Sequence, residues 1–256
     1  MTRKHNSGSR AQVVYGIHPV LETVKAGRRK IYEVLTVEGS SIQKNSRDLL
    51  TGKNIQYRSI SVSDMNSLCG PAQHQGIAAR VGPFPYFDME DIEDDLSRQD
   101  GVVLVLDEIQ DPGNLGGILR SAECFGVKAV FLSRDRSVGI TAVVEKASAG
   151  ASAHLPVCLV GNLARSIDQL KNIGFWIYGS HCEEGVNIFD VDIRGKIAFA
   201  IGSEGKGVRR LTRDKCDVLV NIPTCGKIQS LNVTSAATVL LAEVYRRSIS
   251  GASSGS

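Results

Sequence analysis

The chain has 256 residues, of which 42% are hydrophobic and 22% are charged, and its formal net charge at pH 7 is +3. These values are ordinary for a soluble globular protein and allow one large domain or two of average size. No apolar run reaches the roughly 18 residues that a membrane-spanning helix requires, so we expect no membrane partner.

The cysteines are scattered, with no CxxC pair and no histidine cluster beside them. This pattern argues against a zinc site and a disulfide framework and favours a reducing cytoplasm. We therefore expect no metal, and most of these cysteines should be small buried side chains. They are Cys69, Cys124, Cys158, Cys182, Cys216 and Cys225.

Basic residues form separated clusters, which favour a polyanionic partner although each cluster alone is more often a solvated face. Residues 1–12, which carry the first cluster, are expected to be a flexible basic arm, since they lack the apolar core of a secretory signal. Their Arg and Ser residues also fit an organellar presequence, which leaves the organellar matrix as the alternative location. The clusters are Arg3–Lys4, Arg28–Arg29–Lys30, Arg134–Arg136, Arg209–Arg210–Arg213–Lys215 and Arg246–Arg247.

Residues 13–83 alternate short strand-like and helix-like segments and predict a small α/β domain. Strands are predicted at 31–37, 55–60 and 76–82, and helices at 40–52 and 62–70. Residues 84–100 contain prolines and an acidic run, which predict a linker with a short helix from Asp88.

A longer α/β pattern covers residues 101–248. Its first segment, "VVLVLD" at 102–107, is a continuous apolar run, typical of a strand buried on both faces. Further strands are predicted at 127–133, 175–180, 196–203 and 218–223, and helices at 115–126, 141–151, 162–174 and 233–247. This alternation predicts a mostly parallel sheet with helices on both faces. Residues 249–256 read as a flexible tail.

Ligands of such sheets bind outside the carboxyl ends of the strands, where three loops have unusual chemistry. In the first, "DPGNLGGILRSAECFG", Asp111–Pro112 predicts a turn, Asn114 can cap the helix and Gly126 can end it. Arg120 lies off the apolar stripe of this helix and faces something polar. A solvated arginine is the plainer alternative.

The second loop, "IGSEGKGVRR", has the order GxxGxG, which fits neither a dinucleotide-binding GxGxxG nor a P-loop. Its glycines would let the backbone approach a ligand closely, and Glu204 would repel a pyrophosphate. The loop suits a ligand that carries an amine or cation, or one read through backbone groups. An ordinary glycine-rich turn is the alternative.

The third loop, "IPTCGKIQSLNVTSAATVLLAE", ends a strand at Pro223 and turns at Gly226. Ser230 and Asn232 stand just before the next helix, where Asn232 is a natural N-cap. The small residues of that helix would let it pack closely against another element or a second subunit.

Together and in this order, the three loops resemble motifs one, two and three of the SpoU branch of the SPOUT methyltransferases. "YGIHPVLETV" and "HQGIAARV" in the N-terminal part resemble the accessory RNA-binding domain of the ribosomal-RNA members. The resemblance covers about residues 15–247. Two departures, Thr224–Cys225 and Thr234–Ser235, replace pairs common in the family and could alter packing in the cofactor pocket.

The resemblance implies that the donor is S-adenosyl-L-methionine and the acceptor an RNA ribose 2′-hydroxyl, with a guanosine of large-subunit ribosomal RNA as the best match. It further implies a homodimer and a deep trefoil knot in the catalytic domain, and the methyl transfer requires no metal. Transfer RNA as substrate and a non-catalytic RNA binder of the same fold are the alternatives. A nucleotide-dependent enzyme with a doubly wound sheet is a weaker rival, because its glycine fingerprint is missing.

The family's functional residues match positions of this sequence. The catalytic set would be Asn114, Arg120, Glu204, Ser230 and Asn232. The cofactor set would be Ile201, Gly202, Ser203, Gly205, Ile222, Thr224 and Leu231. In this assignment Leu231 lines the adenosine pocket and Ser230 and Asn232 face the ribose. Because an arginine pKa lies above about 12, Arg120 fits stabilisation of a developing alkoxide better than general-base catalysis.

Overall fold

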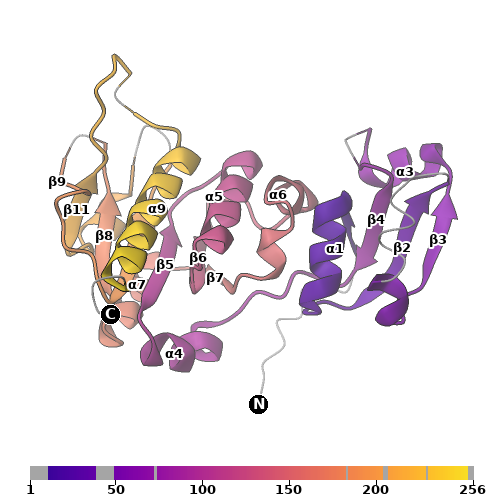
Figure 1. The fold of residues 1–256 in the computed structure, drawn as a ribbon, viewed down its shortest axis with the longest axis horizontal. Helices are drawn as coiled ribbons and strands as arrows, with labels where there is room; N and C mark the ends of the chain where they lie inside the picture. Colours follow the sequence, from indigo (N-terminus) through magenta and orange to yellow (C-terminus); the bar gives the residue numbers. More distant parts are fainter. Residues whose placement is uncertain are drawn as a thin grey trace. The chain divides into compact units, whose positions relative to one another are not determined.

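A computed structural model describes residues 11–38, 49–71, 74–182, 184–203, 207–228 and 230–252. The contacts divide the chain into two compact units (Figure 1). Unit 1 comprises residues 1–85 and 140–154, and unit 2 comprises residues 86–139 and 155–256. Residues 40–48 of the helix predicted at 40–52 lie outside the described residues, and so do residues 1–10 of the predicted basic arm.

Unit 1 is built on a four-stranded sheet with the order β1-β4-β2-β3. Its strands are β1 Gln12–Tyr15, β2 Ile31–Val37, β3 Tyr57–Ile60 and β4 Ile77–Val81. β4 runs antiparallel to both of its neighbours, and β3 runs parallel to β2. Helix α1 (Ile17–Ala26) packs into one apolar cluster of this unit and α3 (Val62–Cys69) into another.

Unit 1 also contains α6 (Ala142–Ala147) and the short 3-10 helix η1 (Ala151–Ala153). The sequence pattern places this segment in the catalytic domain, but α6 contacts β1 and α1, and η1 contacts α1. A buried ion pair of 2.6 Å joins Arg29 Nη1 to Glu145 Oε1 on α6. Burial raises the pKa of Glu145 to about 7, against the opposing effect of Arg29.

Unit 2 is built on a seven-stranded sheet with the order β7-β6-β5-β10-β8-β11-β9, in which every neighbouring pair is parallel. The strands are β5 Gly101–Leu106, β6 Ala129–Ser133, β7 Val157–Val160, β8 Trp176–Ser180, β9 Val186–Asn187, β10 Lys196–Ile201 and β11 Val218–Asn221. Strand β5 is buried from Val102 to Leu106, as the continuous apolar run predicts. The predicted α/β class with a mostly parallel sheet is confirmed.

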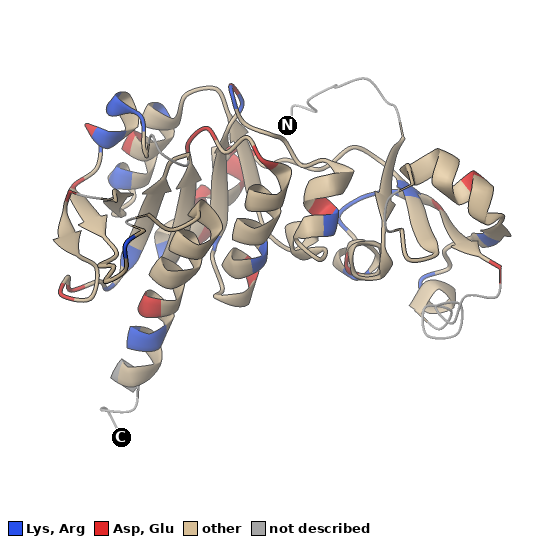
Figure 2. Cartoon of the chain, turned by 90° about the horizontal axis from the view of Figure 1, so that it is seen from above, with Lys and Arg blue, Asp and Glu red and all other residues tan. Residues whose placement is uncertain are grey.

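Helices cover both faces of this sheet (Figure 2). Helices α4 (Met89–Arg98) and α7 (Leu163–Asn172) share one apolar core with alternate residues of β5 and β6. On the other face, α5 (Pro112–Cys124) packs against α9 (Val233–Ala252). The short α8 (Arg210–Arg213) follows the glycine-rich loop after β10.

The start of α5 differs from the prediction. Asp111 is its N-cap and Pro112 its first residue, and Asp111 Oδ1 accepts a hydrogen bond of 2.7 Å from the backbone nitrogen of Asn114. The predicted N-cap, Asn114, is therefore wrong, because the Asp-Pro pair starts the helix earlier and the Asn114 side chain accepts a hydrogen bond from Asn232 instead. The predicted N-cap of α9 is confirmed, since Asn232 Oδ1 accepts from the Thr234 backbone nitrogen at 2.9 Å.

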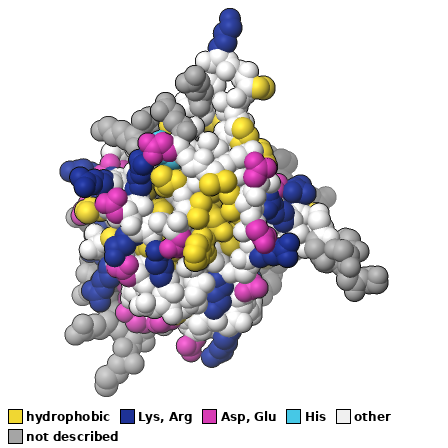
Figure 3. Space-filling view, turned by 90° about the vertical axis from the view of Figure 1, so that its left-hand side faces the viewer, with side chains coloured by type: hydrophobic (Ala, Val, Ile, Leu, Met, Phe, Trp, Pro, Cys, Tyr) yellow, Lys and Arg dark blue, Asp and Glu magenta, His cyan; other side chains and the backbone are white. Residues whose placement is uncertain are grey.

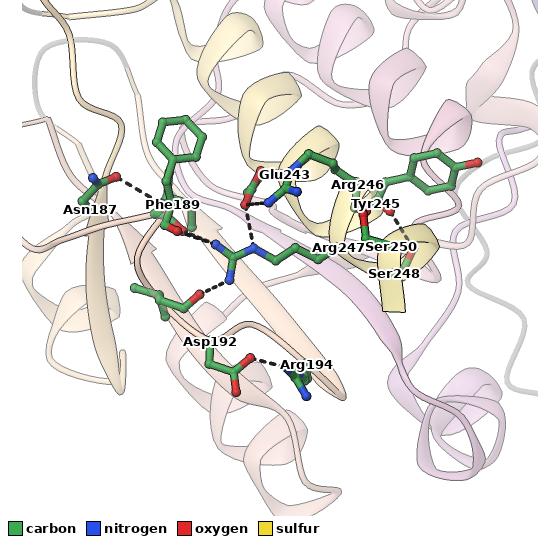
Figure 4. Close-up of polar contacts among 12 residues, drawn as sticks. Asn187, Phe189, Asp192, Arg194, Glu243, Tyr245, Arg246, Arg247, Ser248 and Ser250 are labelled. Carbon is green, nitrogen blue, oxygen red and sulfur yellow. Dashed lines mark hydrogen bonds and ion pairs between the residues drawn. The ribbon is translucent and has the colours of Figure 1, made fainter. Parts of the chain in front are cut away.

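The last turns of α9 are fastened to the loop after β9 (Figure 4). Arg247 donates hydrogen bonds to the carbonyls of Ile188, Phe189 and Val191. Glu243 accepts from Arg246 at 2.9 Å and from Arg247 at 2.6 Å, and these bonds lower the pKa of Glu243 to about 2. The C-terminal helix is thus tied to the outer edge of the sheet by charge-assisted hydrogen bonds.

Candidate active site

The side chains of motif one and motif three meet where α5 and α9 begin. Asn232 Nδ2 donates a hydrogen bond of 2.9 Å to Asn114 Oδ1. Thr234 Oγ1 donates to the Asn114 carbonyl at 3.1 Å. A Cβ on Gly117 would lie 2.6 Å from Thr234 Cγ2, so the close approach of the helices requires this glycine. The close packing of α5 against α9 thus brings two residues that are 118 positions apart in the sequence into direct contact.

A cavity lies at the carboxyl ends of β8, β10 and β11. Its lining includes Ile201, Gly202, Ser203, Ile222, Thr224 and Leu231 from the predicted cofactor set and Ser230 from the predicted catalytic set. Glu204 and Gly205, which the sequence also assigns to the site, lie outside the described residues. The structure therefore gathers into one cavity all the described residues of the predicted cofactor set.

The glycine-rich loop forms one wall of this cavity through its backbone. Gly207 N donates to Ser203 O at 3.0 Å, which closes the loop on itself. A Cβ on Gly202 would lie 1.9 Å from the Gly207 carbonyl oxygen, so no other residue fits here without moving the backbone. Such a wall suits a ligand that is recognised through backbone groups and carbon contacts.

A second cavity of about 290 Å³ adjoins the first, since Ser203 and Val233 line both. Its remaining lining residues are Glu108, Ile109, Gln110, Asp111 and Asn114. The first cavity is walled mainly by small and apolar side chains, whereas the second is rich in carboxylate and amide groups. The Asn114–Asn232 hydrogen bond joins residues of motifs one and three beside this junction.

A buried carboxylate holds the loops around both cavities. Asp107, at the end of β5, accepts hydrogen bonds from Arg209 Nε at 2.7 Å and from Thr212 Oγ1 at 2.8 Å. The hydrogen bond to Asp107 raises the pKa of Arg209. These contacts fasten the segment after the glycine-rich loop to the loop that leads into α5.

Arg120 is the described catalytic candidate that stays apart from the others. It is exposed on α5 and lines neither cavity. Within the described parts of the chain it makes no hydrogen bond or ion pair that would fix its guanidinium. The predicted polar surroundings of Arg120 are therefore solvent in the isolated chain.

Sequence reasoning missed the wall of the first cavity that follows β8. Ser180, His181 and Cys182 line it, and His181 Nδ1 accepts a hydrogen bond of 2.9 Å from Glu184 N. The available signal was their position, because "SHC" spans the end of the strand predicted at 175–180. Glu108 of the second cavity was missed in the same way, directly after the first strand of the sheet.

Among the described residues, no group of three or more His, Cys, Asp or Glu side chains is arranged to hold a metal ion. Within those same residues, no helix combines the length and apolar character needed to cross a membrane.

Two family models match the chain. The model described as the SpoU rRNA Methylase family covers residues 101–242, and the model described as RNA 2′-O ribose methyltransferase substrate binding covers residues 13–87. The first model spans the residues that form both cavities.

Known relatives match over nearly the whole chain. A protein of Xylella fastidiosa named 23S rRNA (guanosine-2′-O-)-methyltransferase RlmB is 42% identical over 92% of this chain and 96% of its own. A putative TrmH family tRNA/rRNA methyltransferase of Staphylococcus aureus is 38% identical over the same shares. The crystal structure of the SpoU methyltransferase AviRb from Streptomyces viridochromogenes, in complex with AdoMet, matches with a TM-score of 0.79. It is 26% identical and covers 94% of this chain and 91% of that one. Motifs, fold and relatives agree, and the chain belongs to the SpoU rRNA methylase family.

Proposed function

We propose that the protein transfers a methyl group from S-adenosyl-L-methionine to the ribose 2′-hydroxyl of a guanosine in large-subunit ribosomal RNA. The observation that carries this proposal is the contact between Asn114 and Asn232 at the junction of two cavities. One cavity has the backbone wall and carbon lining that suit the cofactor. The other offers polar groups to an acceptor nucleoside. The name of the Xylella fastidiosa relative supports the choice of guanosine and ribosomal RNA.

The first cavity would hold the cofactor, which supplies an electrophilic methyl group on a sulfonium. Gly202 permits the backbone to approach it closely, and Ile222 and Leu231 offer apolar walls to its adenosine. The side chain of Leu231 is part of the cavity wall yet 41% exposed, so a bound ligand would remove apolar surface from water there.

The acceptor hydroxyl must be placed in line with the transferable methyl, and the charge that develops on its oxygen must be stabilised. Ser230 lines the cofactor cavity, and Asn114 and Asn232 lie at its border with the second cavity. In this proposal these three side chains orient the ribose. Arg120 stabilises the developing alkoxide, and the hydroxyl proton passes to solvent.

Because Arg120 lines neither cavity of its own chain, we propose a homodimer in which Arg120 of the partner subunit reaches the site. Apolar side chains gather on the face that carries β9 and α9 (Figure 3). The exposed apolar residues of this part of the chain include Val186, Phe189, Tyr245 and Ile249. A contiguous exposed apolar patch is typical of a surface that meets another protein.

The proposal includes the deep trefoil knot that the family resemblance implies. Strand β8 lies between β10 and β11 although it precedes both in the sequence. Two backbone approaches near these strands, Gly202 to Gly207 and Gly185 to Leu219, leave no room for a Cβ. These features support a tightly threaded C-terminal part. The protein would act in the cytoplasm, where ribosomal RNA is present.

The function is tested by mixing the protein with labelled S-adenosylmethionine and unmodified large-subunit ribosomal RNA. The product is then mapped by primer extension that is sensitive to ribose methylation. A signal at one guanosine is expected. Transfer to bulk transfer RNA alone would keep the chemistry and contradict the proposed substrate. Bound cofactor without transfer to either RNA or to assembling ribosomal particles would favour a non-catalytic RNA binder.

A further inference from the structure

Glu108, the second residue after β5, has an unusual backbone. Its φ is 59°, in the left-handed region that is uncommon for residues other than glycine, asparagine and aspartate. A glycine would adopt this conformation without strain, yet the chain places a long charged side chain here. Residues with a strained backbone cluster at functional sites, so the Glu108 carboxylate is a candidate functional group.

The Glu108 carboxylate is held from one side. Its side chain is 12% exposed, and Oε1 lies 3.2 Å from Arg136 Nη1 and 3.4 Å from Arg209 Nη1. Both guanidinium groups approach the same oxygen. Among the described residues, Oε2 has no hydrogen-bond or ion-pair partner. The carboxylate is thus oriented by two cations and retains a free acceptor.

These two ion pairs do not by themselves explain the residue. Arg136 is 71% exposed, and pairs with exposed arginines contribute little to stability. Arg209 is already bound more closely by Asp107, at 2.7 Å. A purely structural role therefore gives little compensation for a partly buried carboxylate on a strained backbone.

Glu108 lines the cavity of about 290 Å³ that adjoins the cofactor cavity. Roughly ten water molecules occupy this volume in the liquid. The cavity is therefore large enough for a purine base. Gln110 and Asn114 line the same cavity, and Ser203 belongs to both cavities. A base held here would keep its ribose near the Asn114–Asn232 pair.

We propose that this cavity holds the base of the target nucleotide and that Glu108 selects guanine. Guanine presents two neighbouring donors, N1–H and the 2-amino group, on the edge by which proteins read unstacked RNA bases. A carboxylate is an acceptor only and can receive both. Adenine and cytosine present an acceptor at the matching ring nitrogen, which a carboxylate repels, and uracil offers one donor. This inference rests on the proposed function and names the residue that sets its base specificity.

The test compares RNA fragments that carry either the mapped guanosine or inosine, which lacks the 2-amino group. In the wild-type protein, kcat/KM is expected to fall roughly 10-fold to 100-fold with inosine, because a charge-assisted hydrogen bond is lost. In Glu108→Gln the ratio between the two substrates should shrink to less than about threefold, since the amide offers one acceptor and adds a donor. Glu123→Gln, the same change at an exposed site on α5, should keep the wild-type ratio.

A second variant separates specificity from folding. Glu108→Gly removes the carboxylate and relieves the backbone, so its thermal midpoint should equal or exceed that of the wild type while its guanosine preference is lost. A lower midpoint with an equal loss on both substrates would show a structural role and overturn the proposal. A full guanosine preference in Glu108→Gln would overturn it as well, with the proposed methyl transfer intact. Absence of transfer by the wild-type protein from any RNA would instead overturn the proposed function and this assignment together.

Discussion

The residues of the candidate site differ in how firmly one chain holds them. Asn114 and Asn232 hold one another, and a backbone hydrogen bond fixes each of them to its helix start. Arg120, by contrast, has an exposed guanidinium. This difference predicts that Asn114 and Asn232 serve to position groups, whereas Arg120 becomes effective only when substrate or a second subunit surrounds it.

Arg120→Ala should lower turnover by about 100-fold or more, as loss of an alkoxide-stabilising group typically does, and should leave cofactor affinity unchanged. Single-turnover methyl transfer and equilibrium binding of S-adenosylmethionine measure the two quantities. Arg98→Ala removes another exposed arginine, on α4, and serves as the matched control. Turnover of Arg120→Ala close to that of the control would contradict the proposed role.

The resemblance to the family's motifs assigned residues that line one cavity, and their role in binding the cofactor stays a prediction. The cap of α5 was misplaced, since Asp111 and Asn114 are both good caps and the proline after Asp111 favours the earlier start. The position of Glu108 after the first strand was visible in the sequence, but its positive φ and its pairing with arginines from other loops were not.

At the scale of elements, long apolar runs such as those of β5 and β10 were predicted close to their observed bounds. The strands β7 and β9 and the helix α8 were missed, since segments of two to four residues are too short to show a period. The far end of α9 was missed as well. It extends past Arg247 to Ala252, beyond the start of the predicted tail.

The attachment of α9 can be tested at Arg247. Arg247→Ala removes a donor shared by three carbonyls and leaves the buried Glu243 with one exposed partner, which should lower the free energy of unfolding by about 3 kcal/mol. Arg246→Ala is the neighbouring control. Its side chain is 61% exposed, so the loss should stay below about 1 kcal/mol. Equal losses in urea unfolding would refute the fastening role of Arg247.

Helix α6 carries a pH prediction. The folded pKa of Glu145, about 7, lies above the ordinary value of 4.5, so the folded state retains a proton that the unfolded state releases between these values. The stabilisation from this group is complete below pH 4.5 and is lost as the pH rises through 7. Relative to Glu145→Gln, the wild type should therefore lose stability from pH 5 to 8, by up to about 1.4 kcal/mol per pH unit. Denaturant unfolding measures this difference.

A constant difference between wild type and Glu145→Gln across the same range would mean that Glu145 titrates at its ordinary pKa in the folded protein.

For the whole molecule, the proposed exchange of Arg120 between subunits predicts complementation. Chains with Arg120→Ala and chains with Asn232→Ala should each be inactive, but a heterodimer has one site with an intact Asn232 and the partner's intact arginine. Heterodimers isolated through two different tags should show roughly half of the wild-type turnover, one active site of two. An inactive heterodimer would mean that Arg120 acts within its own chain.

The two-unit organisation was only partly predictable. Composition changes near residue 84 indicate the first boundary, but the inclusion of residues 140–154 in unit 1 depends on pairs such as Arg29 with Glu145, 116 positions apart. No local pattern encodes such a contact. Hydrophobic periodicity predicts that α6 is a helix, but it does not indicate whether the helix packs in unit 1 or in unit 2.

Residues 140–154 belong to unit 1 although they follow the first part of unit 2 in the sequence, and this has a consequence for the design of chimeras. A chimera that exchanged only residues 1–85 with those of a relative would set a foreign domain against the native α6 and η1, with Glu145 facing an unmatched partner and Gly150 an altered α1 surface. The chain therefore crosses between the units three times, and a functional graft has to carry both segments together.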